Sequence, residues 1–262
     1  MLVYGAYGTG KTTLMGSAVD IPGMRDVLLV DAESGDLALH DNPRVKMPDE
    51  IEVARVTNFM QVARVQEFLR AHVVRRDKDD VEGMRQVEAY LKGVDVSEIK
   101  QPRRFRTVII DSLSEVESYC MSGLLGLNEG EVLTGAADDV DVARFDEFRK
   151  QNIMMQMLVR ALRDLPMHVL FACSQQYNQD ELKRMHYGPQ MTGKLAMQVQ
   201  GFMDVVGLLK TGTIDETGQA PRRLYVQPVE RFDAKNRRAA FKGTHLDNPT
   251  MTTVFQAFGL DK

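Results

Sequence analysis

The stretch LVYGAYGTGKTTL, residues 2–14, decides the fold that we expect for this chain. It contains the spacing G-x-x-x-x-G-K-[ST], with Gly5 at the start and Gly10, Lys11 and Thr12 at the end. In a loop of this kind, glycines adopt backbone angles that side chains forbid, and successive backbone N–H groups form a concave anion site. An apolar strand precedes the loop and a helix-like run follows it, as the motif requires. The stretch therefore predicts a phosphate-binding loop for a nucleoside triphosphate.

Each position of the loop has an expected role toward the nucleotide. Lys11 is expected to reach the β- and γ-phosphates, and the Thr12 hydroxyl to coordinate Mg²⁺. The other positions are expected to bind phosphate mainly through their backbone; they are Gly5, Gly8, Thr9, Gly10 and Thr13. ATP and Mg²⁺ are therefore the expected cofactors.

Length and composition place the chain among ordinary globular proteins. Its 262 residues, 44% of them hydrophobic, are enough to bury a core without disulfides or a structural metal. No apolar run approaches the roughly 20 residues that span a membrane. Two cysteines, Cys120 and Cys173, and the absence of a secretory signal before the loop favour a cytoplasmic location. The net charge of −4 does not indicate a nonspecific nucleic-acid binder, although basic clusters occur.

Short apolar runs alternate with longer helical patterns, which is typical of an α/β fold with a mostly parallel sheet and helices on both faces. Helical spacing of apolar residues covers residues 59–75 and 145–165. A charged, weakly amphipathic segment around residues 76–103 is expected to be a helical insertion. The expected strands are residues 2–4, 27–30, 53–56, 107–110, 169–173, 205–209 and 224–227.

Two further acidic positions follow expected strands. In TVIIDS, residues 107–112, consecutive β-branched residues indicate a strand buried on both faces, and Asp111 follows at its carboxyl end, where a carboxylate can hold a metal-bound water. Many ATPases with a phosphate-binding loop carry a glutamate directly after this aspartate, but this chain has Ser112. Glu33, in VLLVDAESG, lies just past a second buried strand and is the expected general base. An ordinary turn is the alternative for Asp31 and Glu33.

The order of these motifs, followed by LFACSQQ at residues 170–176, resembles the ATPase core of RecA-type recombinases. The resemblance implies a single RecA-like ATPase domain over residues 1–262, with a C-terminal β extension. It also implies Glu33 as the water-activating base, Asp111 on the metal-bound water, and Gln175 as the sensor of the γ-phosphate, with Gln176 as its rival. GPQMTGKLA before DVVGLLK is similar to phage-encoded members that act in single-strand annealing and recombination.

The segment that follows the strand of the expected sensor, Gln175, is the expected DNA-binding loop. Within residues 177–192 it carries Lys183, Arg184 and Tyr187, and this combination suits single strands, whose phosphates meet cations and whose bases stack on rings. An ordinary surface loop is the alternative.

RFDAKNRRAAF, residues 231–241, resembles the stretch of RecA-type proteins whose basic pair crosses the subunit interface to the neighbour's γ-phosphate. Lys235 and Arg237 occupy the places of that pair. The alternative is a basic hairpin that is solvated or contacts DNA.

The motifs predict an ATPase, and the resemblance implies that it acts on single-stranded DNA in recombination or annealing, is encoded by a phage and works in the host cytoplasm. The expected partners are single-stranded DNA, further copies of the chain in a ring or filament, and a single-strand DNA-binding protein. Three other functions remain open: a DNA translocase or helicase-type motor, a small-molecule phosphotransferase, and a nucleotide-gated assembly or loading factor with negligible turnover.

Overall fold

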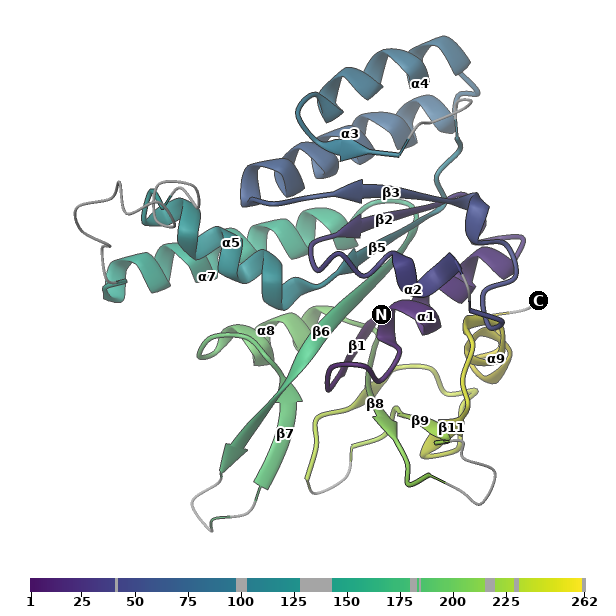
Figure 1. Ribbon diagram of the computed structural model, residues 1–262, viewed down its shortest axis with the longest axis vertical. Helices are drawn as coiled ribbons and strands as arrows, with labels where there is room; N and C mark the ends of the chain where they lie inside the picture. Colours follow the sequence, from purple (N-terminus) through teal and green to yellow (C-terminus); the bar gives the residue numbers. More distant parts are fainter. Residues whose placement is uncertain are drawn as a thin grey trace.

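The computed structural model describes residues 1–40, 42–97, 103–127, 143–179, 183, 185–214, 220–228 and 231–260. Its strands are β1 (Leu2–Gly5), β2 (Val27–Asp31), β3 (Ile51–Arg55), β4 (Asp95–Val96), β5 (Thr107–Asp111), β6 (His168–Gln179), β7 (Met185–Pro189), β8 (Val205–Thr211), β9 (Arg222–Tyr225), β10 (Lys235–Asn236) and β11 (His245–Asp247). Over these residues they form one sheet in the order β11-β9-β8-β1-β6-β5-β2-β3-β4, with β10 on β8 and β7 on β6 (Figure 1).

Helices cover both faces of this sheet. They are α1 (Lys11–Gly16), α2 (Leu37–His40), α3 (Phe59–Arg76), α4 (Val81–Val87), α5 (Leu113–Leu124), α7 (Phe145–Arg163), α8 (Leu195–Phe202) and α9 (Met251–Ala257). One apolar cluster joins the sheet to α3, α5, α7 and α8, and a second joins it to α1 and α9. Within the part of the chain described here, no helix is long and apolar enough to cross a membrane.

The central strands are parallel and buried on both faces. Every residue of β1, β2 and β5 is buried, as expected for apolar, β-branched runs between two helical layers. β1 pairs in parallel with β6 and β8, and β2 pairs in parallel with β3 and β5. Beyond β8 the pairing becomes antiparallel through β9 and β11. The predicted α/β class with a C-terminal β extension is confirmed, and each of the seven expected strands is present.

The charged segment around residues 76–103 contains more than helix. α4 packs against α3 and is followed by a 3-10 helix, Glu88–Leu91 (Figure 1). β4 then pairs antiparallel with β3 and forms that end of the sheet. Residues 98–102 lie outside the described residues.

One buried polar side chain has no hydrogen-bond partner within the described residues. His72 of α3 is 2% exposed, and neither ring nitrogen is bonded. Its ring packs between Phe68 and Phe105, with centroids 5.3 Å from each. Burial lowers the pKa of His72 to about 4, and the charge of Arg76 acts in the same direction. The native fold therefore holds this imidazole neutral, whereas the unfolded chain protonates it near pH 6.5.

We expect His72→Phe to reduce the acid sensitivity of the fold. Because the unfolded state binds the proton first, stability falls as pH drops from 7 toward 4, by about 2 kcal/mol at pH 5 for this group. Urea unfolding at pH 7.5 and pH 5 should show a smaller loss in the variant than in the wild type. His40→Asn, at an exposed position, is the matched control and should follow the wild type. Equal losses in all three proteins would contradict the assignment.

Candidate nucleotide-binding site

The phosphate-binding loop connects β1 to α1. Gly8 and Gly10 have φ angles of 73° and 88°, in the region that favours glycine. Gly5 is required for a different reason, because a Cβ there would collide with the carbonyl oxygen of Leu209 on the neighbouring strand. The side chain of Lys11 is buried and donates hydrogen bonds to the carbonyl oxygens of Gly5 and Ala6, at 3.1 and 3.2 Å. The loop therefore holds its lysine folded inward.

An oxygen pair suitable for a magnesium ion lies beside the loop. The Thr12 hydroxyl donates to Oδ2 of Asp111 at 2.5 Å. Gly35 faces this pair: a Cβ there would lie 3.6 Å from Oγ1 of Thr12 and 4.0 Å from Oδ2 of Asp111. Within the described residues, no group of three or more His, Cys, Asp or Glu side chains could hold a metal. One hydroxyl and one nearby carboxylate fit Mg²⁺, which keeps several waters and takes its other ligands from phosphate.

The acidic residues Asp31, the last residue of β2, and Glu33, in the turn that follows, have different roles. Asp31, paired in register with Asp111, accepts hydrogen bonds from the backbone N–H groups of Glu33, Gly35 and Asp36. It therefore holds the turn together. Glu33 is exposed, and its carboxylate accepts a hydrogen bond from the buried Ser112 hydroxyl.

Ser112 was missed as a site residue by the sequence reasoning, which noted only that it replaces a glutamate. The peptide bond that joins it to Asp111 is cis. Its hydroxyl links the end of β5 to the glutamate expected as the base. A serine directly after the aspartate that ends an apolar strand was the available signal in the sequence.

Both sensor candidates lie at the same edge as the loop. β6 pairs with β1 as far as Ser174, which lies opposite Gly5. Gln175 and Gln176 are the next two residues of β6, so they lie beside the start of the phosphate-binding loop. Gln176 lines a cavity of about 480 Å³ together with residues of α5 and α7 and the segment that follows β7. The choice between the two glutamines stays as the sequence left it.

The expected DNA-binding loop is largely a hairpin. β6 continues to Gln179 and β7 returns from Met185, so much of the described part of the segment is paired strand, contrary to the loop expected. Lys183 is exposed at the turn. Tyr187 is half-buried, with its ring 5.0 Å from that of Tyr177 and Nζ of Lys210 4.4 Å from its centre. Arg184 lies outside the described residues.

Lys235 and Arg237 lie toward the opposite edge of the sheet. β10 pairs with the amino end of β8, where Lys235 stands opposite Val206. The ammonium of Lys235 donates to the carbonyl oxygens of Gln200 and Gly201 at the end of α8, at 3.0 Å each. Arg237 pairs with Asp204 at 3.3 Å. Neither side chain faces the phosphate-binding loop of its own chain.

A family comparison agrees with this geometry. The sequence model of a family described as AAA domain matches residues 1–238. The chain belongs to the AAA domain family. It is therefore a nucleotide-binding ATPase of the P-loop, AAA type, and the match extends over the loop, both acidic strands, the hairpin and the basic pair. No curated protein gives a significant match.

The basic clusters of this AAA domain differ in their pairing. Arg103 pairs with Glu52 at 2.8 Å, and its neighbour Arg104 pairs with Asp79. Arg223 pairs with Asp247 at 2.8 Å. Arg222 has no acidic partner among the described residues and lies against Gly10 of the phosphate-binding loop, 212 positions away in the sequence. No local sequence signal could have revealed that contact.

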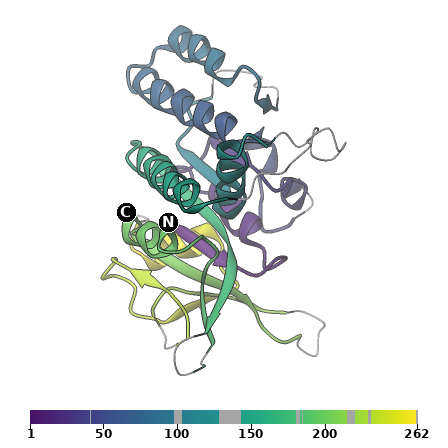
Figure 2. The same cartoon turned by 90° about the vertical axis from the view of Figure 1, so that its left-hand side faces the viewer.

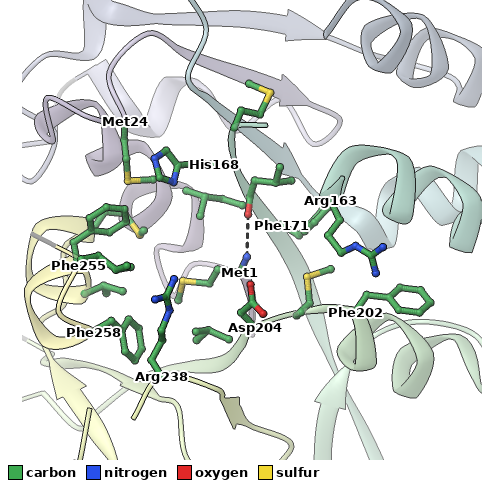
Figure 3. Close-up of a pocket in the computed structure, with 18 residues that line it drawn as sticks. Met1, Met24, Arg163, His168, Phe171, Phe202, Asp204, Arg238, Phe255 and Phe258 are labelled. Carbon is green, nitrogen blue, oxygen red and sulfur yellow. Dashed lines mark hydrogen bonds between the residues drawn. The ribbon is translucent and has the colours of Figure 1, made fainter. Parts of the chain in front are cut away.

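An apolar pocket lies at the far edge of the AAA domain, at the amino ends of β1, β6 and β8 (Figure 3). It has a volume of about 230 Å³, and Phe202, Phe255 and Phe258 are among its lining residues. The Met1 amino group donates to the carbonyl oxygen of Val169 at 2.9 Å inside it (Figure 3). None of the residues expected to bind nucleotide lines this pocket.

The carboxyl group of Asp111 is buried in the site, and its pKa is raised. Burial raises the pKa of its carboxyl from an ordinary 3.8 to about 6; the Thr12 hydrogen bond and Lys11 oppose this, and the Glu33 and Asp31 carboxylates reinforce it. A carboxyl with a raised pKa stabilises the fold at low pH, and this contribution is lost as pH rises through 6. Above that pH the ionised group costs the nucleotide-free fold about 3 kcal/mol.

We expect Asp111→Asn to stabilise the nucleotide-free protein, because the amide keeps an acceptor for Thr12 and removes the buried charge. At pH 7.5 the gain should be about 1–3 kcal/mol, or several degrees in unfolding temperature, and it should shrink toward pH 5. Thermal unfolding in a chelator measures it. Asp49→Asn, at an exposed position, serves as the control. A gain that does not depend on pH would count against the raised pKa.

Proposed function

We propose that this AAA-type ATPase binds single-stranded DNA and hydrolyses ATP with Mg²⁺ in phage recombination or strand annealing. It works in the host cytoplasm as a ring or filament of identical protomers, with a single-strand DNA-binding protein as a further partner. The observation that carries the proposal is the continuity of β6, which runs without interruption from the nucleotide edge into the hairpin with β7.

The residues beside the loop support hydrolysis. In the proposed reaction, water attacks the γ-phosphorus, the bond to the β–γ bridging oxygen breaks, and Glu33 accepts the proton of the water. Ser112 holds one oxygen of that carboxylate and thereby orients it. Lys11 neutralises negative charge on the phosphates once it leaves the carbonyls of Gly5 and Ala6.

The hairpin supports the binding of single-stranded DNA. Five residues of β6 continue beyond Ser174, and the hairpin projects from the sheet (Figure 2). Tyr177 is 57% exposed and offers a ring for stacking, which is worth about 1–3 kcal/mol per base. The ring of Tyr187 contacts that of Tyr177 in an edge-to-face arrangement, and Lys183 supplies a cation at the turn. We retain Lys183, Arg184 and Tyr187 as proposed DNA contacts and add Tyr177.

Contacts connect the hairpin to the basic pair. The Asp233 carboxylate bonds to His186 of β7 at 2.8 Å and to the Gln200 amide at 2.9 Å. The carbonyl of Gln200 in turn accepts a hydrogen bond from Lys235. Because the Asp233 carboxylate contacts both the hairpin and Gln200, displacement of the hairpin by DNA can move Gln200 and with it the ammonium of Lys235. This connection supports DNA-stimulated turnover.

The position of the basic pair supports action in trans. Lys235 and Arg237 are held at the end of the sheet opposite the phosphate-binding loop of the same chain. A neighbouring protomer stacked on that end would meet both cations with its own loop. Supplied cations of this kind contribute about 10³–10⁵ in rate, because they offset charge on the γ-phosphate.

We expect single-stranded DNA to raise the ATPase rate of the wild type. Glu33→Gln should keep ATP binding and lose about 10²–10⁴ in turnover, because it removes the proton acceptor. Lys11→Ala should instead weaken ATP binding, because it removes the phosphate-binding cation. ATP hydrolysis with and without single-stranded DNA, together with equilibrium ATP binding, measures these effects.

Glu67→Gln, on the exposed face of α3, is the matched control for loss of one carboxylate and should behave as the wild type. Near-normal turnover in Glu33→Gln would assign the base to another residue. A rate that depends on an acceptor molecule and ignores DNA would identify a phosphotransferase, and directional movement along DNA would identify a motor.

We expect Lys235→Ala with Arg237→Ala to abolish turnover while each protomer still binds ATP. Mixing this double variant with Glu33→Gln should restore part of the activity, because at shared interfaces each protein supplies what the other lacks. The measurement is the ATPase rate against mixing ratio. Arg238→Ala, which removes a neighbouring exposed cation, is the control. Co-assembly without recovery of activity would place the pair elsewhere.

A further inference from the structure

Arg222 lies directly against the phosphate-binding loop of its own chain. A Cβ on Gly10 would lie 2.7 Å from Cζ of Arg222, closer than real side chains pack. The guanidinium therefore occupies the space that the missing side chain of Gly10 leaves open. This contact brings a cation from β9 to a loop whose backbone is shaped to bind anions.

The backbone beneath this arginine is fixed from both sides. Its N–H donates to Oδ1 of Asn248 at 3.0 Å, and its carbonyl accepts a hydrogen bond from the N–H of Asn248 at 2.6 Å. The next residue, Arg223, pairs in register with Asp247 of β11. The position of Arg222 is thus set by the C-terminal β extension, so this part of the fold contributes to the nucleotide edge.

A second arginine stands beside the first. Nη2 of Arg44 lies 3.5 Å from the same Asn248 oxygen. Burial lowers the pKa of Arg222, and the charge of Arg44 acts in the same direction. Neither arginine has an acidic partner among the described residues, whereas Arg223, on the other side of the strand, pairs with Asp247. Two positive charges close together in a half-buried place without a counter-ion repel each other, and this favours the binding of an anion between them.

The side of the loop on which they lie indicates which part of the nucleotide they meet. The Asn42 amide, two residues before Arg44, donates to the Thr13 hydroxyl at 3.2 Å. Thr12 contacts Asp111. In the sheet order, β5 and β2, which lead to Asp111 and Glu33, lie on one side of β1, whereas β9 with Arg222 lies on the other. The hydrolytic groups thus mark the γ-phosphate side, and the two arginines lie on the side toward the nucleoside.

We propose that Arg222, assisted by Arg44, binds the α- and β-phosphates of the nucleotide held by the loop of the same chain. The inference rests on nucleotide binding by this loop and is independent of DNA. It makes Arg222 a cation that acts in cis during binding, distinct from Lys235 and Arg237, which are proposed to act in trans during hydrolysis. The fork of a guanidinium suits two phosphate oxygens at once.

The test is nucleotide binding without DNA, measured by titration of a fluorescent ATP analogue and its displacement by ATP or by inorganic tripolyphosphate. Arg222→Ala should weaken ATP and tripolyphosphate by a similar factor of about 10–100, as expected for loss of hydrogen bonds between charged groups. Arg222→Lys should be intermediate. Arg44→Ala should weaken both ligands by less. The effect of Arg222→Ala should not change with protein concentration, because the contact is within one chain.

Arg223→Ala is the matched control, since it removes one arginine from the same strand, and it should bind as the wild type does. Arg222→Gln, which keeps most of the side-chain stem, decides the matter if the alanine variant does not fold. Weakened ATP with unchanged tripolyphosphate would assign Arg222 to the nucleoside and overturn the proposal, as would affinities equal to those of Arg223→Ala. A wild type that binds no ATP, or Lys11→Ala that binds it normally, would instead refute nucleotide binding by the loop.

Discussion

The parallel pairing of β2 with β5 places Asp31 beside Asp111, and the candidate nucleotide-binding edge is arranged around these two carboxylates. Like charges side by side in a buried place repel, so each needs its own partners. Asp31 takes three backbone N–H groups of the following turn, and Asp111 takes the hydroxyl of Thr12. Because Asp31 accepts the backbone hydrogen bonds of the turn, the carboxylate of Glu33 is left to accept the hydrogen bond of the Ser112 hydroxyl. The register of one strand pair thus fixes the loop, the metal side and the expected base together.

Much of this could be read from the sequence because the deciding signals are local. The strand cores are short runs of buried apolar residues, and the loop motif is contiguous, so both were predictable. The alternation of strands and helices gave the α/β class for the same reason. What escaped prediction depends on distant segments. Ser112 meets Glu33 across 79 positions, and Arg222 meets Gly10 only through the folded extension. The hairpin after Ser174 was mistaken for a loop because its polar residues resemble loop composition, although cross-strand pairing orders them.

Electrostatics divides the nucleotide edge into two halves. On one side of the loop, Asp111 is buried with two further carboxylates nearby, and its pKa is raised. On the other side, Arg222 and Arg44 stand together without an acid among the described residues. Each half is unfavourable in the free protein, since like charges are gathered in partly buried places. A magnesium-bound nucleotide carries a cation and anions in the matching order, so its binding relieves both halves at once. The repulsion that lowers the stability of the free protein would then increase its affinity for the nucleotide, because binding removes that repulsion.

The placement of Lys235 and Arg237 opposite the phosphate-binding loop gives a protomer two unlike ends. Protomers that join unlike ends form head-to-tail contacts, which close into a ring or continue as a filament. On the proposed arrangement, a ring completes every one of its sites. An open chain always leaves the loop of one terminal protomer without a neighbour's cations. The number of working sites then counts interfaces rather than protomers, so a short filament turns over less ATP per chain than a long one.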